Sequence, residues 1–317
     1  MTSTQVRRAK VRRDLSGVLL LDKPAGISSN SALQRARTRL GARKAGHTGN
    51  LDVEASGLLP VCFGEATKIS GWLLDSDKIY EATLSLGVTT DTGDAEGRVR
   101  EIRAVTPVML AAVPEVLSRF LGSQTQVPPM YSALKRNGRP LYELARAGIE
   151  VERLPRQITV YALEALALVG NELRLRVHCS KGTYVRVLAE DIGEALGCGA
   201  SLTALRRTHA GPFGLGDAVT LEALEACGEP LEAFDHRLLP ADVALVGMPV
   251  VVLPAASAKR LLMGQVIPVR TQGAVGAARA YAASGEFLGL VELDGERGIR
   301  PRRLFGIGPG SQGAKTQ

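Results

Sequence analysis

The alternation of apolar and polar residues is clearest in one stretch beyond the middle of the chain. From 172 to 179 every second residue is apolar, which is the two-residue period of a strand with one buried face. Gly170 and Asn171 separate this stretch from an apolar run at 160–169. The pattern therefore predicts a β-hairpin.

Helical spacing follows the hairpin. Apolar residues between 184 and 196 recur on one helical face, and Gly197 is placed to end that helix. Two short apolar runs nearer the N-terminus, at 17–21 and 58–63, predict buried strands.

Between these two strands, Ser28 or Ser29 can cap a helix that runs to about Leu40, and a further helix is expected to open near Glu65. Strands and helices thus mix without a regular βαβ repeat. We therefore expect an α+β fold built on a mixed, largely antiparallel sheet.

The residue composition of the chain changes at two places. Residues 122–156 contain a proline-led segment and a short amphipathic piece, which predict an excursion from the sheet. The second change falls near 247–249. Beyond it, short β-rich runs separated by turn residues indicate a small β-barrel, with strands expected at 250–253, 266–269 and 287–293.

Positive charge is concentrated at the N-terminus. The formal net charge is +7, but residues 1–50 hold eleven Lys and Arg against two Asp, a net of +9, so the other 267 residues carry −2. A concentrated field attracts a polyanion, although a solvated tail and a solvated helix face explain the same charges equally well. The predicted parts are a disordered basic arm at 1–13, a main domain at 14–247, and a barrel domain with its tail at 248–317.

The cysteines and the hydropathy suggest a compartment. Four cysteines form no Cys-x-x-Cys pair, as is typical of reduced thiols in a cytosolic protein. The basic N-terminus is not followed by the apolar run of a secretory signal, and no stretch of about 18 or more apolar residues occurs. We expect a cytoplasmic protein without a membrane segment.

Several familiar catalytic motifs are absent from the sequence. It has no Gly-x-x-x-x-Gly-Lys-Ser/Thr phosphate loop, no Gly-x-Gly-x-x-Gly after a strand and no His-Glu-x-x-His. Ser132 and Lys135 match the Ser-x-x-Lys of serine acylases, but the companion motifs Ser-Asp-Asn and Lys-Thr-Gly are missing. The four histidines lie far apart without ligand spacing, so we expect neither a metal nor a cofactor.

The densest set of functional residue types lies at 43–60, RKAGHTGNLDVEASGLLP. Its three glycines permit positive φ angles and close approach of a ligand to the backbone. Asp52 sits between two apolar residues, where loss of water would make a carboxylate more reactive or require a cation beside it. Taken alone, such a loop is more often a structural turn.

The longer string changes this interpretation. The chain closely resembles the bacterial TruB family of tRNA pseudouridine-55 synthases from about residue 17 to 305. Five blocks carry the resemblance, in the same order and with similar spacing: LLLDKPAGISSN, GHTGNLDVEASGLLPVCFGEATK, DSDKIYEA, HCSKGTYVR and CGASLTALRR. Residues 122–156 resemble the thumb-like RNA-binding insert of the stand-alone bacterial enzymes. Segment 249–308 resembles, more weakly, the small RNA-binding barrel called PUA.

The resemblance implies a pseudouridine synthase fold and the isomerisation of uridine to pseudouridine at position 55, in the T loop of tRNA. The reaction breaks the C1′–N1 glycosidic bond, turns the uracil and rejoins it through C5, without a metal, cofactor or redox step. It needs a carboxylate at C1′, much as glycosidases do, and the resemblance assigns that role to Asp52. It also implies the tRNA T-arm as the partner and a monomer that needs no other protein.

Other site residues are implied in the same way. Tyr80 matches the tyrosine that stacks on the base and is placed to remove the C5 proton. Arg186 matches the arginine that pairs with the catalytic aspartate, where a bidentate guanidinium would hold the carboxylate ionised. Tyr184 and Leu205 match positions that line the uridine pocket. His47 matches the histidine that enters the RNA loop where the target base is flipped out.

Two further features qualify the match. Lys23 and Pro24 match a loop that supports the tyrosine, so we interpret them as structural neighbours. Where the family usually reads Gly-Ala-Leu-Asp-Pro-Leu-Ala-Thr-Gly, this chain departs at Asn50, Val53, Glu54 and Ser56. The lost proline and the added charge bear on the rigidity of the loop and leave the roles above unchanged.

Two other functions stay open at this point. A tRNA chaperone or RNA-binding module would share the binding features, but an intact set of Asp52, Tyr80 and Arg186 argues against it as the sole role. A guide-dependent synthase that acts on other RNAs is disfavoured by the insert at 122–156, because those relatives lack a comparable segment.

Overall fold

The computed structural model of the chain describes residues 12–227, 231–269 and 273–306. The predicted basic arm at 1–13 falls mostly outside these ranges. Its residue Arg13 does not belong to a disordered arm, because the side chain pairs with Glu232 at 3.6 Å and with Asp235. Its backbone also forms a bridge with Ala42.

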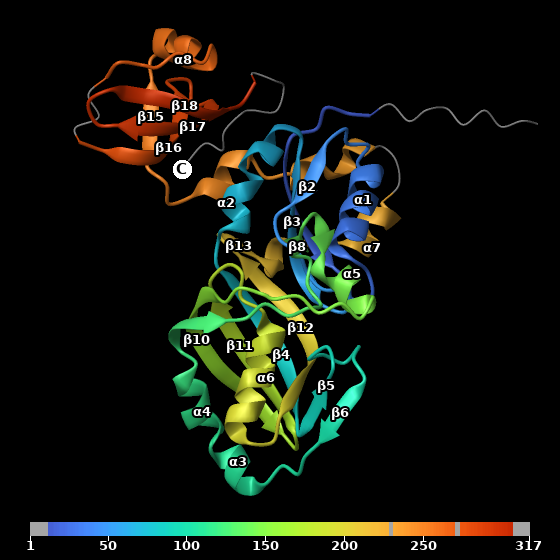
Figure 1. The fold of residues 1–317 in the computed structure, drawn as a ribbon. Helices are drawn as coiled ribbons and strands as arrows, with labels where there is room; N and C mark the ends of the chain where they lie inside the picture. The colour runs from blue at the N-terminus through green and yellow to red at the C-terminus, as the bar shows by residue number, and fades with distance from the viewer. Residues whose placement is uncertain (1–11, 228–230, 270–272, 307–317) are drawn as a thin grey trace, which may run out of the picture.

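A ten-stranded sheet forms the main domain (Figure 1). Eight strands follow one another across it: β14 (Val219–Thr220), β1 (Gly17–Lys23), β3 (Ser56–Phe63), β12 (Ala200–Ala210), β4 (Lys78–Leu86), β11 (Glu172–Cys179), β10 (Arg156–Val169) and β7 (Gly122–Gln126). β2 (Ala45–His47) pairs with β3, and β13 (Phe213–Gly214) pairs with β12. All neighbours are antiparallel except β1 with β14 and β3 with β12. The α+β class with a mixed, largely antiparallel sheet is confirmed.

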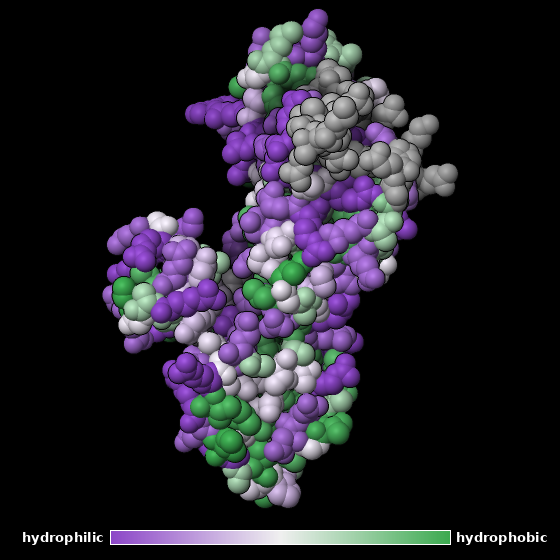
Figure 2. All heavy atoms as spheres, turned by 90° about the vertical axis from the view of Figure 1, so that its right-hand side faces the viewer, coloured by the Kyte–Doolittle hydropathy of each residue, from purple (hydrophilic) through white to green (hydrophobic). Residues whose placement is uncertain are grey.

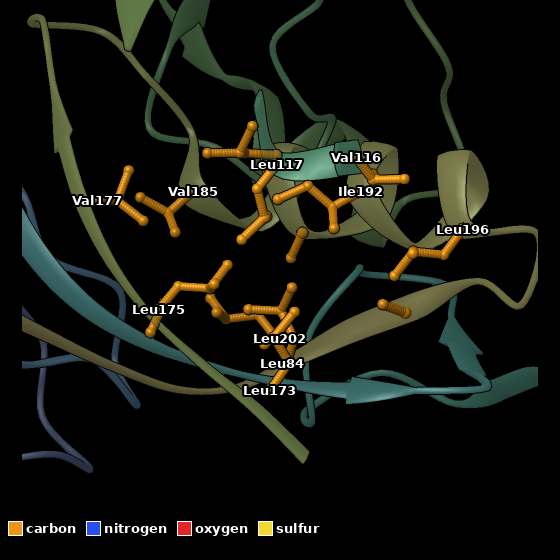
Figure 3. Packing of buried hydrophobic residues seen from close by; sticks show 14 of the residues in the cluster. Leu84, Val116, Leu117, Leu173, Leu175, Val177, Val185, Ile192, Leu196 and Leu202 are labelled. Carbon is orange, nitrogen blue, oxygen red and sulfur yellow. The ribbon is translucent and has the colours of Figure 1, made fainter. Parts of the chain in front are cut away.

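The predicted hairpin and the helix after it form the core of one half of this sheet. β10 and β11 meet at the predicted turn, and α6 (Val185–Leu196) ends at Gly197, whose φ of 85° is left-handed. The helices α6 and α4 (Val113–Arg119) cover one face of β4, β11 and β12, with α3 (Pro107–Ala111) before α4 (Figure 3). Leu175 of β11 and Ile192 of α6 both belong to this buried cluster, and each is at most 1% exposed. Burial of such a side chain stabilises the fold by about 1.5–3 kcal/mol.

The other half of the sheet carries α1 (Ser29–Arg39) and α7 (Leu221–Ala226) on one side. Ser28 is the cap of α1, since its Oγ accepts a hydrogen bond from the Ser31 backbone at 3.1 Å. The helix expected near Glu65 begins as a 3₁₀ turn, η1 (Gly64–Ile69), and continues as α2 (Ser70–Leu74). None of the helices in the described ranges is long and apolar enough to cross a membrane.

The two halves meet along a short parallel seam between β3 and β12. Two residue pairs form it, Arg206 with Ser56 and Arg207 with Gly57. A Cβ atom on Gly57 would lie 2.3 Å from the Arg207 carbonyl oxygen, and its φ is 104°. Only glycine permits this close approach.

The segment predicted to leave the sheet begins inside it. Its first five residues form the edge strand β7, paired with β10. The part beyond β7 holds the small hairpin β8 (Lys135–Arg136) and β9 (Arg139–Pro140), followed by α5 (Leu141–Arg146). In Figure 2 it is the lobe at the left, at the height of α5 in Figure 1, and it stands out from the body of the molecule. We call residues 127–155 the insert.

The C-terminal domain is a four-stranded sheet with one helix. Its elements are β15 (Val250–Leu253), α8 (Ala255–Leu262), β16 (Val275–Ala282), β17 (Phe287–Asp294) and β18 (Gly298–Leu304). The strand predicted at 266–269 is wrong, because only a single bridge forms there, between Ile267 and Ile299. Pro268 lacks the N–H that a continued ladder would need.

The C-terminal domain packs on the main domain through a shared apolar cluster. Phe287 and Phe305 belong to the same buried cluster as Ile69 and Leu73 of the main domain. Tyr281 of β16 donates a hydrogen bond of 2.7 Å to Asp242, in η4 (Ala241–Leu245). The two domains are therefore joined by core packing as well as by polar contacts.

Candidate active site

Asp52 lies in a loop between β2 and β3 that is held on both sides. The backbone N–H of Leu51 donates to the Ser29 hydroxyl at 2.8 Å, and the same hydroxyl donates to the Leu51 carbonyl at 3.1 Å. Thr48, fully buried, donates to the Pro60 carbonyl through its backbone at 3.1 Å. The loop thus takes its position from α1 and β3 and presents the Asp52 side chain outward.

The environment of Asp52 differs from the desolvated one that its apolar neighbours suggested. The Asp52 side chain is 45% exposed, and Val53 beside it is 39% exposed. Leu51 faces the core instead, at 4%. The carboxylate is therefore open to an incoming ligand, and its electrostatic partner is a cation rather than an apolar wall.

That cation is Arg186, in the first turn of α6 and 5% exposed. Its Nη2 atom lies 2.6 Å from Oδ2 of Asp52, and its Nη1 atom lies 3.0 Å from Oδ2 of Asp94. Nη1 also donates to the Thr92 carbonyl at 3.2 Å, and Nη2 to the Tyr131 carbonyl at 3.3 Å. The pairing of Arg186 with Asp52 is as expected, but the guanidinium bridges two carboxylates instead of binding one in a bidentate manner.

Asp94 was not identified from the sequence. It lies in the turn between β5 (Val88–Thr90) and β6 (Val99–Ile102), where its Oδ1 accepts from the Thr92 hydroxyl at 2.5 Å and from the Glu96 backbone at 3.2 Å. Only Oδ2 is left for Arg186. The run of Asp, Thr and Gly at 91–94 indicates a tight turn, but no local pattern shows that this turn reaches α6.

Tyr80 lies on β4, opposite Val177 of β11 and Arg207 of β12. Its ring packs against the core cluster that α6 covers. Burial raises the pKa of the phenol, while the Arg207 guanidinium beside it acts in the opposite direction and the nearby charge of Asp52 adds to the rise. Tyr80 is therefore within the electrostatic reach of the carboxylate, as its proposed role requires.

The other predicted site residues surround the same region. Leu205 and Asp52 line one cleft. Tyr184 caps α6 just before Arg186, and Gln126 holds it by bonds of 2.8 Å to its N–H and 3.1 Å to its carbonyl. Burial raises the pKa of the Tyr184 phenol. Asp52 and Leu205 thus share one concave site, and the charge of Asp52 also reaches the Tyr184 phenol.

His47 lies on β2, next to the loop of Asp52 and half-buried. Burial lowers the pKa of its imidazole, and the positive charge of Arg207 lowers it further. Its Nδ1 is buried without a hydrogen-bond partner among the described residues. The ring is thus neutral at neutral pH and free of a fixed polar contact on that side.

The cleft at Asp52 is unusually acidic on one wall. Glu54 and Glu96 line it together with Asp94. Burial raises the pKa of Glu96, and the charges of Asp94, Glu54 and Asp52 raise it further. Glu54 is one of the departures from the family motif, so this chain places an extra negative charge at the mouth of the site.

Lys23 supports the Asp52 loop. It is fully buried, and its Nζ donates to the carbonyls of Pro24 at 2.9 Å, Ile27 at 2.7 Å and Val53 at 3.2 Å. Burial lowers its pKa to about 8. The bond to Val53 ties the loop after β1 to the loop of Asp52, and the hydrogen bonds of Lys23 among the described residues do not include Tyr80. Support of the tyrosine by this loop stays a prediction.

The described residues contain no group of three or more His, Cys, Asp and Glu side chains placed to hold a metal ion. Asp52 and Asp94 direct carboxylate oxygens to Arg186. The positive charge in this site is supplied by the protein itself.

Comparison with known families accounts for almost the whole chain. The family described as "TruB family pseudouridylate synthase (N terminal domain)" matches residues 37–185. "tRNA pseudouridylate synthase B C-terminal domain" matches 186–246, and "Pseudouridine synthase II TruB, C-terminal" matches 249–305. The tRNA pseudouridine synthase B of Pseudomonas fluorescens (strain Pf0-1) is 54% identical over 305 residues, which cover 95% of this chain and 98% of the relative. The chain belongs to the TruB family.

Further relatives agree. The tRNA pseudouridine synthase B of Dechloromonas aromatica is also 54% identical, over 92% of this chain and 96% of its own length. Among solved structures, the one titled "Crystal Structure of a Cbf5-Nop10-Gar1 Complex" aligns with a TM-score of 0.69 and 26% identity, covering 92% of this chain and 85% of that chain. The fold is that of a pseudouridine synthase, and the C-terminal sheet is its PUA-like domain.

Proposed function

We propose that this TruB-family protein isomerises uridine to pseudouridine at position 55 in the T loop of tRNA, with Asp52 as the catalytic carboxylate. The observation that carries the assignment is the contact of 2.6 Å between an exposed Asp52 and a buried Arg186. A charge-assisted hydrogen bond from a buried guanidinium fixes the position of the carboxylate. The names of the relatives supply the reaction, and the geometry supplies a group that can perform it.

In the proposed mechanism the target uridine is flipped out of the T loop and enters the cleft at Asp52. Extrusion of a stacked base costs a few kcal/mol, and the neutral ring of His47 fills the space that the base leaves. Tyr184 and Leu205 hold the uracil by apolar contact. Asp52 acts at C1′ while the C1′–N1 bond breaks. The uracil then turns to present C5, and a C1′–C5 bond forms as the carboxylate leaves C1′.

The last step removes the C5 proton. We assign it to Tyr80, because the phenol lies near Asp52 and is positioned by strand pairing. As phenolate, its oxygen takes the proton from C5: the O–H bond forms, the C5–H bond breaks, and the electron pair returns to the uracil ring. The phenol then gives this proton to water and N1 takes one from water, so the product is neutral and the phenolate is restored.

The insert is proposed to bind the T-arm. Its Tyr131 carbonyl accepts a hydrogen bond of 3.3 Å from Arg186, so the base of the insert touches the arginine that holds Asp52. RNA bound to the insert would therefore affect the position of Arg186 beside Asp52. The insert also favours a stand-alone enzyme, active as a monomer in the cytoplasm, over a guide-dependent one.

The test is to map pseudouridine in tRNA after incubation with purified protein alone, wild type beside Asp52→Asn. The amide keeps the shape but loses the charge, so we expect a loss of at least roughly 10³-fold, about 4 kcal/mol of barrier. Filter binding of tRNA should change little. Asp217→Asn, at an exposed aspartate of η2 (Leu215–Asp217), is the matched control and should stay active.

The alternatives give different results. A tRNA chaperone would bind and refold RNA but leave no pseudouridine with the wild type. A guide-dependent synthase would need a second RNA before any product formed. Activity of Asp52→Asn within about tenfold of wild type would rule out the assignment of the carboxylate.

A further inference from the structure

Arg207 is the largest fully buried side chain among the described residues, at 1% exposure. It lies on β12 and opposes Tyr80 of β4 on one side and Gly57 of β3 on the other. Directly opposed residues of an antiparallel pair project to the same face of a sheet. The guanidinium and the phenol ring are therefore neighbours on one face, at the seam between the two halves of the sheet.

The same guanidinium holds both ends of the Asp52 loop. Its Nε donates to the Leu58 carbonyl at 2.7 Å, and its Nη1 donates to the Asn50 carbonyl at 3.4 Å. Gly49 packs directly on it, since a Cβ atom there would lie 3.3 Å from Nη1. One side chain thus connects the loop that carries Asp52 with the strand that pairs with Tyr80.

The remaining nitrogen of Arg207 lacks a well-aligned hydrogen-bond partner among the described residues, although the guanidinium acts on the Tyr80 phenol. Nη2 is buried and makes no hydrogen bond with any described residue, and no ion pair within the described ranges neutralises the cation. A buried charge and an unused donor are both unfavourable, so their presence beside the reaction centre calls for a functional explanation.

The groups that act on the Tyr80 phenol come from three elements. Burial raises its pKa most, the Arg207 guanidinium of β12 lowers it, and Cys179 of β11 and Asp52 of the loop raise it. Arg207 is thus the cation that opposes the other three effects. Loss of Arg207 would raise the pKa of the phenol further and so favour its neutral form, in which the oxygen is a much weaker base for the C5 proton.

We propose that Arg207 is a positioning residue of the reaction, which fixes the Asp52 loop against the strand pair of Tyr80 and stabilises the Tyr80 phenolate with its unused Nη2 donor. The inference rests on the proposed function and adds to it a second arginine, distinct from Arg186. Arg186 holds the carboxylate that acts at C1′, whereas Arg207 serves the group that acts at C5.

The experiment compares Arg207→Met with Arg206→Met in the full-length protein. Arg206 is its neighbour on β12, but it is 42% exposed and pairs with Asp22 at 2.7 Å, so it is a matched control. The first readout is single-turnover release of tritium from 5-³H-uridine in a T-arm hairpin, with filter binding alongside. The second is the pKa of Tyr80, from a ¹⁹F NMR titration of protein labelled with 3-fluorotyrosine, where Tyr80→Phe identifies the resonance.

For Arg207→Met we expect tritium release slower by about 10²-fold or more, as for loss of a general base, with tRNA binding little changed. The Tyr80 pKa should rise, and the defect in release should shrink as pH increases, because more phenolate forms. Arg206→Met should leave the Tyr80 pKa at its wild-type value. A purely structural role of Arg207 would not move this pKa.

Release and a Tyr80 pKa equal to wild type in a folded Arg207→Met variant would overturn the inference. Absence of pseudouridine with the wild type would instead refute the proposed function. If circular dichroism shows that Arg207→Met does not fold, Arg207→Lys replaces it. Lysine keeps the charge, so the Tyr80 pKa should stay near wild type while release is intermediate; a raised pKa in this variant would also overturn the inference.

Discussion

The Arg186 side chain divides its two amino groups between carboxylates of different exposure. Asp94 is 15% exposed and Asp52 is 45% exposed. The more buried carboxylate holds the arginine, and the more exposed one faces the substrate. A bidentate pair with Asp52 would occupy both of its oxygens, whereas the observed contact uses Oδ2 and leaves Oδ1 free of Arg186. The reactive oxygen and the oxygen held by the arginine can therefore be different atoms.

Asp94→Asn should slow pseudouridine formation by roughly 10–10²-fold, because Arg186 loses the carboxylate that fixes it and the barrier rises by about 1.4–2.7 kcal/mol. tRNA affinity should be retained. Single-turnover product formation and filter binding measure the two effects. Asp91→Asn, in the same turn, is the control, since its Oδ1 accepts only from the backbone of Arg98 at 2.8 Å. Equal losses in both variants would show that the turn, and not the contact with Arg186, matters.

Tyr80→Phe separates stacking from proton transfer. The ring and its packing survive, so tRNA binding should be normal, but release of tritium from C5 should fall by about 10²–10⁴-fold, as for a lost general base. Tyr80→Leu should weaken binding as well, because the stacking surface is also lost. Near-normal release with phenylalanine would reduce Tyr80 to a stacking platform.

Single residues were predictable where they belong to a motif. Asp52, Tyr80 and Arg186 lie in blocks that resemble the family; the structure pairs Arg186 with Asp52 and places the Tyr80 phenol within reach of the Asp52 charge. Asp94 and Arg207 could not be found in this way, because their roles depend on which turn and which strand pack beside the loop. A buried arginine next to an exposed one, as in the pair 206–207, has no signature in sequence.

At the level of elements, α6 is positioned by how closely it approaches β12. A Cβ atom on Gly193 would lie 2.2 Å from the backbone nitrogen of Ala200, so no larger residue fits without a shift of the helix. Because α6 carries Arg186 in its first turn, the close contact at Gly193 helps to fix the position of the guanidinium relative to Asp52.

Gly193→Ala should therefore destabilise the protein by about 1–3 kcal/mol through overpacking and lower activity at the same time. Urea unfolding followed by circular dichroism gives the free energy. Gly71→Ala in α2 is the matched control, since nothing lies within 4 Å of a Cβ atom there. Its stability should be unchanged or up to about 1 kcal/mol higher, from the greater helix propensity of alanine. A stable, fully active Gly193→Ala would contradict this account.

Elements with a strong period were predictable, and those without one were not. β11 was predicted because one face is buried under α6 and the other is solvated, which imposes strict alternation. β16 (VGAARAYA) was missed, because its small residues lack the β-branched and aromatic pattern of a strand and are placed by pairing with β15 and β17. The run at 266–269 had the composition of a strand, but the proline within it prevents a ladder.

Over the whole molecule, the two domains share an apolar cluster. The rings of Phe287 and Phe305 are in tilted contact, with centroids 5.0 Å apart, and belong to the same cluster as Ile69 and Leu73. Lys68 also donates to the Leu304 carbonyl at 2.7 Å. The orientation of the PUA-like domain is thus determined by core packing.

Thermal unfolding should consequently show one transition for both domains. Trp72 is the only tryptophan and lies under Arg302 at the domain boundary, 5.3 Å from its guanidinium carbon, so its fluorescence reports the interface. We expect the fluorescence and circular dichroism curves to coincide, as in a two-state transition. Phe287→Ala should lower stability by about 3–5 kcal/mol and shift both curves together. An early loss of the fluorescence signal alone would show that the domains unfold separately.

The narrow seam between β3 and β12 has a mechanical consequence. Two residue pairs join these strands, whereas nine join β12 to β4. We therefore expect the sheet to bend most easily along the seam between β3 and β12. Asp52 precedes β3, in one half of the sheet, while Tyr80 of β4 and Arg186 of α6 belong to the other half. A small change of twist at this seam would alter the gap between Asp52 and the two other groups while the packing within each half of the sheet stays intact.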